Sequence, residues 1–205
     1  MKTKEKILYG ALDLFNQDIA SQVTTNDIAR ELNMSPGNLY FHYKNKEQII
    51  RELFKKLAQD TTQIWKPQTK LAKKREKAQI VDFIDRNLQL HWRYRFFHRE
   101  LYTLRKKDPE LSKLWRAHLK KMSRLMILLH KHWVRSGQMK PIQSRYEMEF
   151  LGELLFVSSN SFMQFFETVD RYPSAKTIEK ARKHLIRMLM PYMGDEIKNS
   201  LVKYF

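Results

Sequence analysis

Apolar residues recur at intervals of three and four positions along most of this chain, which is the spacing of an amphipathic helix. In residues 3–16, for example, Ile7, Ala11 and Phe15 fall on one stripe. Only five glycines and six prolines occur in 205 residues, so few positions would interrupt a helix. The sequence therefore predicts an all-α protein. Its longer helical segments are expected at 46–65, 78–107, 108–135, 145–170 and 174–190.

Several helix-boundary signals follow one another near the N-terminus. Thr24 and Asp27 have the spacing of a capping box, in which a hydroxyl and a carboxylate accept hydrogen bonds from each other's backbone N–H groups. Asn33 tolerates the left-handed conformation that ends a helix. Ser35 and Pro36 then suit the N-cap and the first position of another helix. Two short helices joined by a tight turn are typical of a helix-turn-helix, whose second helix can enter the major groove of DNA.

The second short helix is polar. Asn38, Tyr40 and His42 carry hydrogen-bonding groups, and Gly37 would let the backbone approach another surface closely. Free N–H groups at a helix N-terminus also suit phosphate oxygens. An ordinary surface helix is the alternative. The two caps, the turn and the flanking apolar pattern occur together, however, and this combination favours a DNA-reading helix.

This segment closely resembles the N-terminal domain of the TetR family of transcriptional regulators (TetR/AcrR-like). The resemblance covers about the first quarter of the chain, and both spacing and residue type agree across three helices. Ile19 and Asn33 depart from the pattern, because the family often has glycine at these two positions. The matching residues are Ala11, Leu14, Phe15, Thr24, Asp27, Ile28, Ala29, Ser35, Gly37, Leu39, Tyr40, His42, Tyr43, Lys46 and Glu47.

The resemblance implies a three-helix DNA-binding domain at 1–47 and a helical effector-binding and dimerisation domain at 48–205. It also implies a ligand-responsive regulator, most simply a repressor, that binds a pseudo-palindromic operator in double-stranded DNA as a homodimer. Its effector would be a small molecule of unknown identity. The expected DNA-binding residues are Thr24, Thr25, Ser35, Pro36, Gly37, Asn38, Tyr40, His42, Tyr43, Lys44 and Lys46.

The predicted helix at 78–107 is rich in aromatic residues, and arginines alternate with aromatic residues in 92–99. Packing in the core is the first interpretation, pocket lining the second, and stacking on nucleic-acid bases the third. His118 lies on an apolar helix face, where it is either a core histidine or a polar anchor inside a pocket. The expected pocket residues are Phe54, Leu57, Phe83, Trp92, Phe96, Phe97, Trp115, His118, Met122 and Phe150.

The helices expected at 145–170 and 174–190 have more apolar residues than one face requires, as do the dimerisation helices of the family. Gly152 and Ser159 are seven positions apart, so another helix could approach there. A monomer that uses both helices for its own core is the alternative. The expected dimer-interface residues are Leu151, Leu155, Ser159, Phe162, Ala181, Leu185 and Met188.

The formal net charge is +17, but the basic excess lies outside the expected DNA reader. Residues 1–50 hold six basic and six acidic side chains, whereas residues 51–150 hold 25 basic and 10 acidic ones. This excess could attract DNA over a long range, attract an anionic ligand, or simply face solvent.

Enzyme and metal chemistry find little support in the sequence. There is no cysteine, and none of the seven histidines follows an acidic residue by three positions. No HExxH, phosphate loop or nucleophile motif is present. We therefore expect no cofactor, no catalytic or metal-binding residues and no membrane span, and hence a cytoplasmic protein. A helical enzyme and a basic protein that binds nucleic acid without sequence preference are the rival interpretations.

Overall fold

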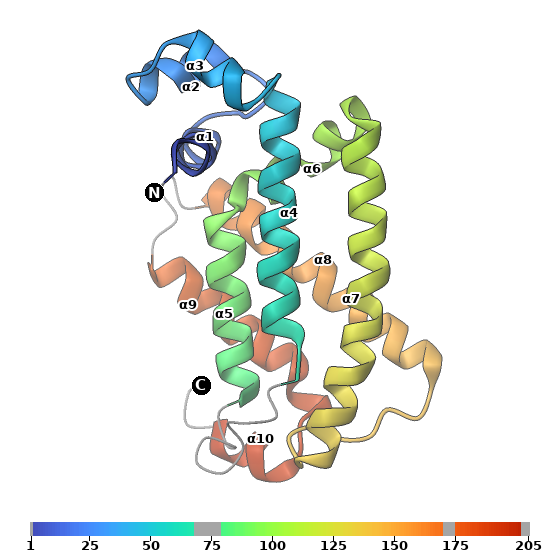
Figure 1. Ribbon diagram of the computed structural model, residues 1–205. Helices are drawn as coiled ribbons and strands as arrows, with labels where there is room; N and C mark the ends of the chain where they lie inside the picture. The colour runs from blue at the N-terminus through green and yellow to red at the C-terminus, as the bar shows by residue number, and fades with distance from the viewer. Residues whose placement is uncertain (1, 68–78, 170–174, 202–205) are drawn as a thin grey trace. The chain divides into compact units, whose positions relative to one another are not determined.

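The computed structural model describes residues 2–67, 79–169 and 175–201, and its described residues form helices and no strands (Figure 1). This confirms the predicted all-α class. The elements are α1 (Thr3–Gln17), α2 (Thr25–Glu31), α3 (Pro36–His42), α4 (Lys46–Trp65), α5 (Gln79–Arg93), α6 (Arg95–Lys107), α7 (Pro109–Arg135), α8 (Arg145–Val169), α9 (Ala175–Leu189), the 3₁₀ helix η2 (Met190–Tyr192) and α10 (Asp195–Leu201).

The segment 78–107, which we expected to be one helix, is two. Tyr94 leaves the helical conformation with φ −113° and ψ 34°, and α6 restarts at the next residue. This break exposes N–H groups at the start of α6, and the side chain of Asn16 accepts a hydrogen bond from one of them, the N–H of Phe96, at 3.2 Å. The expected start at residue 78 lies outside the described residues.

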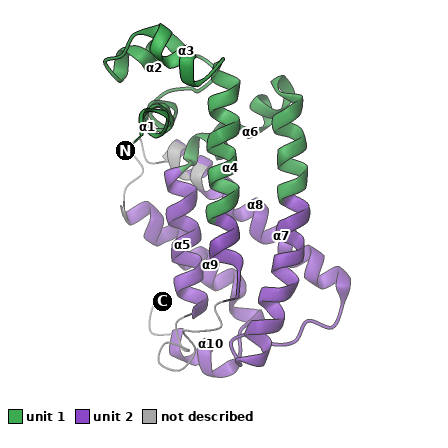
Figure 2. Cartoon of the chain, viewed as in Figure 1, with its two compact units in different colours: residues 1–60, 94–118 green, residues 61–93, 119–205 purple. Residues whose placement is uncertain are grey.

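The chain divides into two compact units (Figure 2). Unit 1 comprises Met1–Asp60 and Tyr94–His118, and unit 2 comprises Thr61–Arg93 and Leu119–Phe205. Helices α4 and α7 each supply residues to both units. Helix α6 thus belongs to the same unit as the N-terminal helices, although it lies far beyond them in the sequence.

The local signals near the N-terminus form the structures that they predict. Thr24 and Asp27 make both bonds of the capping box, at 2.9 and 3.1 Å. Asn33 has a φ of 50°, and Ser35 caps α3 by accepting the N–H of Asn38 at 3.2 Å. Ile28 on α2 and Leu39 on α3 are fully buried, as is the stripe of α1 formed by Ile7, Ala11 and Phe15.

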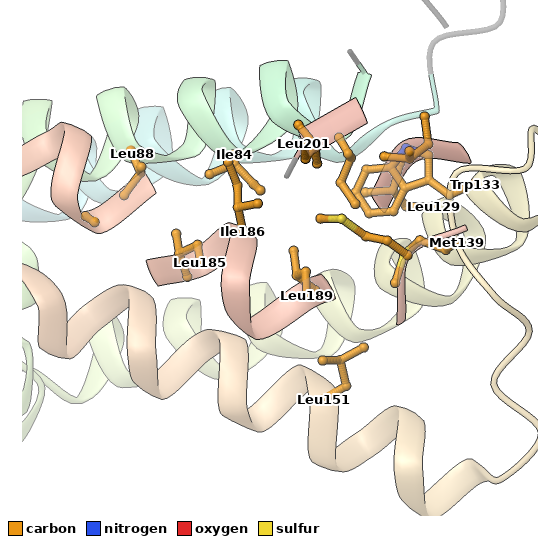
Figure 3. Packing of buried hydrophobic residues seen from close by; sticks show 14 residues of the cluster. Ile84, Leu88, Leu129, Trp133, Met139, Leu151, Leu185, Ile186, Leu189 and Leu201 are labelled. Carbon is orange, nitrogen blue, oxygen red and sulfur yellow. The ribbon is translucent and has the colours of Figure 1, made fainter. Parts of the chain in front are cut away.

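Unit 2 has its own apolar core, to which α5, α7, α8, α9 and α10 contribute (Figure 3). Leu151, Ala181 and Leu185 belong to this core and are 3%, 0% and 5% exposed. We predicted that these three residues form a dimer interface, and burial within their own protomer makes that prediction wrong. The reason is that α8 and α9 use part of their apolar surplus to pack on α5 and on each other.

We predict that Leu185→Ala will lower the free energy of unfolding by about 2–5 kcal/mol, because it leaves a cavity in a packed core. Urea denaturation at one fixed protein concentration measures this. Lys180→Ala, which changes an exposed side chain of the same helix, is the control. Equal stability of the two variants would contradict the placement of Leu185 in the core.

Candidate nucleic-acid interface

Helix α3 presents almost all of its side chains to solvent. Of its seven residues, only Leu39 is buried, and this side chain anchors the helix on the domain core. Pro36, Gly37 and Asn38 are exposed, and a Cβ atom added to Gly37 would meet nothing within 4 Å. The first turn of α3 is therefore open to a partner at the level of the backbone itself.

Tyr40 extends this open surface and is held in place by α2. Its hydroxyl lies 2.8 Å from the Thr25 hydroxyl in a hydrogen bond, and its side chain is 48% exposed. Phe41 is 84% exposed, and its ring packs edge-on against that of His42 at 5.1 Å. We did not predict a role for Phe41 from the sequence. Its position next to Leu39 and Tyr40 was the available signal, because a helix that buries Leu39 must turn residue 41 to another side.

Two of the predicted DNA-binding residues instead hold the domain together. Tyr43 is only 1% exposed, and its hydroxyl donates a hydrogen bond to the carbonyl of Lys4 at 3.2 Å. Burial raises the pKa of Tyr43 to about 12, and the nearby carboxylates of Glu52 and Glu5 add to this shift. Tyr43 thus fastens α1 to the end of α3, and we correct its assignment as a DNA contact.

Lys46 is the second predicted DNA-binding residue that binds its own chain instead. Its ammonium group donates to the carbonyls of Ala20, Ser21 and Val23 at 2.8, 2.9 and 2.6 Å. An ammonium has three N–H donors, so these bonds use all of them and leave none for a phosphate. Burial lowers the pKa of Lys46 from its usual value. This lysine closes the turn between α1 and α2.

Helix α6 holds the same turn from another side. The carboxylate of Glu100 accepts the N–H groups of Ala20 and Ser21 at 2.7 and 3.0 Å. The guanidinium of Arg99 donates to the carbonyls of Phe15 and Asp18 at 2.8 and 2.5 Å. We call Lys46, Arg99 and Glu100 the polar clamp. No local sequence signal pointed to the two residues on α6, which lie about 80 positions beyond the turn that they bind.

The polar clamp explains how the turn tolerates Ile19. Among the described residues other than glycine, only Asn33 has a positive φ, so Ile19 avoids the strained left-handed conformation. The N–H groups of Gln22 and Val23 instead donate to the Ile19 carbonyl, at 2.9 and 3.3 Å. The charged side chains of the polar clamp and these two local hydrogen bonds therefore bind the backbone groups of the turn, and the turn needs no glycine.

Thr24, Thr25 and Lys44 lie beside the α3 surface. The Thr24 hydroxyl donates to the Asp27 carboxylate at 2.7 Å, and this bond is the main reason why the pKa of Asp27 is lowered. Thr25 is partly buried under the Tyr40 hydroxyl, whereas Lys44 is exposed. The three residues border the exposed face of α3 with two hydroxyls and one cation.

Half of the predicted pocket residues form one aromatic cluster within unit 1. The centroid of the Phe54 ring lies 5.8 Å from that of Phe97, 5.7 Å from that of Trp115 and 5.7 Å from that of His118. The ring centroids of Phe96 and Phe97 are 4.1 Å apart, and the two ring planes are tilted by 35°. The phenylalanines and Trp115 are buried, so this part of the cluster is core packing, which was the first interpretation of the sequence.

The other predicted pocket residues are dispersed. Leu57 is buried in unit 1, and Met122 is buried in unit 2. Phe83 and Trp92 pack against the core of unit 2, with the Phe83 ring 5.0 Å from that of Trp133. Phe150 is 48% exposed. Pocket lining stays a prediction for these residues and for His118.

Two features of the described residues bear on other classes of function. None of the described helices combines the length and the apolar character that a membrane span needs. The described histidines and carboxylates do not gather into a group of three that could hold a metal ion.

The fold and the exposed α3 define a helix-turn-helix protein of the DNA-binding regulator class. Residues 7–53 match a family model described as bacterial regulatory proteins of the tetR family, and residues 47–201 match the TetR model described as a bacterial transcriptional repressor. The chain therefore belongs to the TetR family. It is a DNA-binding transcriptional regulator and not an enzyme.

Individual relatives agree with this assignment. The HTH-type transcriptional regulator QacR of Staphylococcus aureus is 28% identical over 119 residues, which are 56% of this chain and 63% of QacR. IcaR of Staphylococcus epidermidis, a negative regulator of the biofilm operon icaADBC, is 39% identical over 49 residues, 24% of this chain and 26% of IcaR. The matched regions thus span less than two thirds of both proteins.

A crystal structure of a TetR-family regulator from Marinobacter aquaeolei VT8 superposes over 100% of this chain and 97% of its own, with a TM-score of 0.86 and 25% identity. The likeness therefore includes both units and not only the helix-turn-helix.

We predict that Glu100→Ala will destabilise the protein by about 1–3 kcal/mol, because the N–H groups of Ala20 and Ser21 lose their acceptor. Chemical denaturation measures the loss. Glu31→Ala removes an exposed carboxylate from unit 1 and should change stability by less than about 0.5 kcal/mol. If both variants match the parent protein, the polar clamp does not contribute to stability.

Proposed function

We propose that this regulator represses transcription by binding a pseudo-palindromic operator as a homodimer, with the α3 helix of each protomer in a major groove. The exposed face of α3 carries this proposal. A seven-residue helix with one buried side chain contributes little to the core, and its open backbone at Gly37 suits close approach to a duplex.

The side chains divide by the type of DNA contact that they can make. Thr25 and Lys44 suit phosphate oxygens, which set the position of the protein on the duplex. Thr24 stays in this group only if its hydroxyl leaves the Asp27 carboxylate, to which it donates in the free protein. Asn38 can both donate to and accept from an adenine edge. The remaining groove-facing residues are Ser35, Pro36, Gly37, Tyr40 and His42.

Homodimer formation is supported by apolar residues on the outer side of α8. Phe150, Phe156, Val157 and Phe165 are each 42–58% exposed on a single helix, which is costly for a monomer in water. A two-fold axis would present two α3 helices to half-sites about one helical turn of DNA apart. Leu155, Ser159, Phe162 and Met188 are partly buried and stay within the proposed interface.

A small-molecule effector is proposed to bind among α4 to α8 and to favour a conformation with the two reading helices wrongly spaced. Such control requires different affinities for two conformations. The proposal is supported by the position of α6, which carries Phe96 and Phe97 of the aromatic cluster and also Arg99 and Glu100 of the polar clamp. Displacement of α6 would therefore act directly on the turn that orients α2. DNA binding would take place in the cytoplasm.

We predict that Tyr40→Ala will weaken operator binding about 5- to 150-fold, the effect of losing one good contact in the groove. The operator is first obtained by selection from random duplex DNA, and its affinity is then measured by fluorescence anisotropy. Tyr102→Ala, which removes an exposed tyrosine from α6, is the control. A folded, dimeric Tyr40→Ala protein with parental operator affinity would contradict the proposed docking.

We predict that Val157→Arg will shift the protein from dimer to monomer at micromolar concentration, because it brings a charge into an apolar contact. Sedimentation velocity measures the change in mass. Leu128→Arg places the same charge on an exposed apolar position of α7 and should leave the dimer intact. If both variants form dimers with equal affinity, the dimer interface does not lie on α8.

A further inference from the structure

The part of α7 that lies in unit 2 carries a one-sided group of cations. Lys120, Lys121, Arg124, Lys131 and Arg135 are all exposed. No acidic residue occurs anywhere from position 111 to 146 of the sequence. None of these five cations forms an ion pair with a described residue. We call them the α7 basic face.

The spacing of the α7 basic face makes it a straight, rigid line of charge. Lys120, Arg124, Lys131 and Arg135 follow one another at intervals of four, seven and four, so they fall within about 60° of the helix circumference. The line extends for about 22 Å at the rise of an α-helix. On the other side of α7, Leu129 and Trp133 are buried in the unit 2 core, which fixes the rotation of the helix.

We propose that the α7 basic face binds the phosphate backbone of duplex DNA without regard to base sequence. Affinity for DNA of any sequence comes mainly from cations that replace the counterions of the phosphates. Residues 1–50, which include α3, carry no net charge, so they add little to this attraction beyond single contacts such as that of Lys44. The cations of α7, which form no ion pair with a described residue, can supply it, because a duplex presents a regular line of negative charge.

A lipid surface is a poorer match for this face. A helix that binds a membrane inserts its own apolar side among the lipids. The apolar side of α7 is instead enclosed by protein, and only Ile127 and Leu128 are apolar and exposed in this part of the helix. An acidic protein has the right charge, and the experiment below includes it as a competing outcome.

The test compares two variants of the full chain that lose the same charge. Lys120→Gln/Arg124→Gln/Lys131→Gln neutralises three positions of the α7 basic face. Lys66→Gln/Arg145→Gln/Lys198→Gln neutralises three exposed cations of unit 2 outside α7. Thermal melting followed by circular dichroism establishes that both variants are folded. Their affinities for a duplex that lacks the operator are then measured by fluorescence anisotropy between about 50 and 200 mM salt.

We expect the α7 variant to bind this duplex about tenfold or more weakly at the low-salt end. The slope of log affinity against log salt should fall in magnitude by about two to three, close to 0.9 for each lost phosphate contact. The control variant should change the slope by less than about one. Equal slopes for the two variants, or loss of binding to polyglutamate or to anionic lipid vesicles with binding to DNA unchanged, would overturn the proposal.

A further comparison separates this inference from the proposed operator reading. Tyr40→Ala should lose part of its preference for the operator, about 5- to 150-fold, and keep the full salt slope on the duplex without an operator. The parent protein could show no operator preference while the α7 variant still has a smaller salt slope. That result would contradict operator reading by α3 and support DNA binding by the α7 basic face. If Tyr40→Ala reduces the slope as much as the α7 variant does, the basic face is not a separate surface.

Discussion

The orientation of α3, the proposed reading helix, depends on one short turn and on the three charged side chains that bind it. Lys46, Arg99 and Glu100 make seven hydrogen bonds to backbone groups of residues 15–23. Removing a charged group from water is costly unless its partners are well placed, and losing one partner is more costly still. The polar clamp therefore restricts how α2 can be oriented relative to α1. Helix α3 follows α2 after a turn that contains the left-handed Asn33.

The polar clamp also ties one distant helix, α6, to the N-terminal helices. Its α6 residues, together with the bond from Phe96 to Asn16, tie the first turns of α6 to α1 and the following turn. In unit 1, α6 therefore lies with the N-terminal helices. The division into a DNA-binding and an effector-binding domain at residue 47 stays a prediction. A displacement of α6 would reach the reading helix through hydrogen bonds and not through a flexible linker.

Charge and apolar surface are divided between different parts of the chain. The first 50 residues have no net charge and present polar groups suited to base edges, whereas α7 carries a line of exposed cations suited to phosphates. Helix α8 supplies Leu151 to the core of its own protomer and keeps Phe156 and Val157 exposed. Sequence-specific reading, general attraction to DNA and self-association would thus use separate surfaces, so each can be altered by mutation without the others.

Local sequence was sufficient for the helical class of the chain, for the capping box of Thr24 and Asp27 and for the left-handed Asn33, because each depends on interactions within a few residues. The roles of Tyr43 and Lys46 depended on the tertiary structure, since a polar side chain near a DNA-reading helix can face either the duplex or its own chain. The break at Tyr94 and the burial of Leu185 were also decided by distant partners. A helical periodicity shows that a face is apolar, but only the packed structure shows what covers that face.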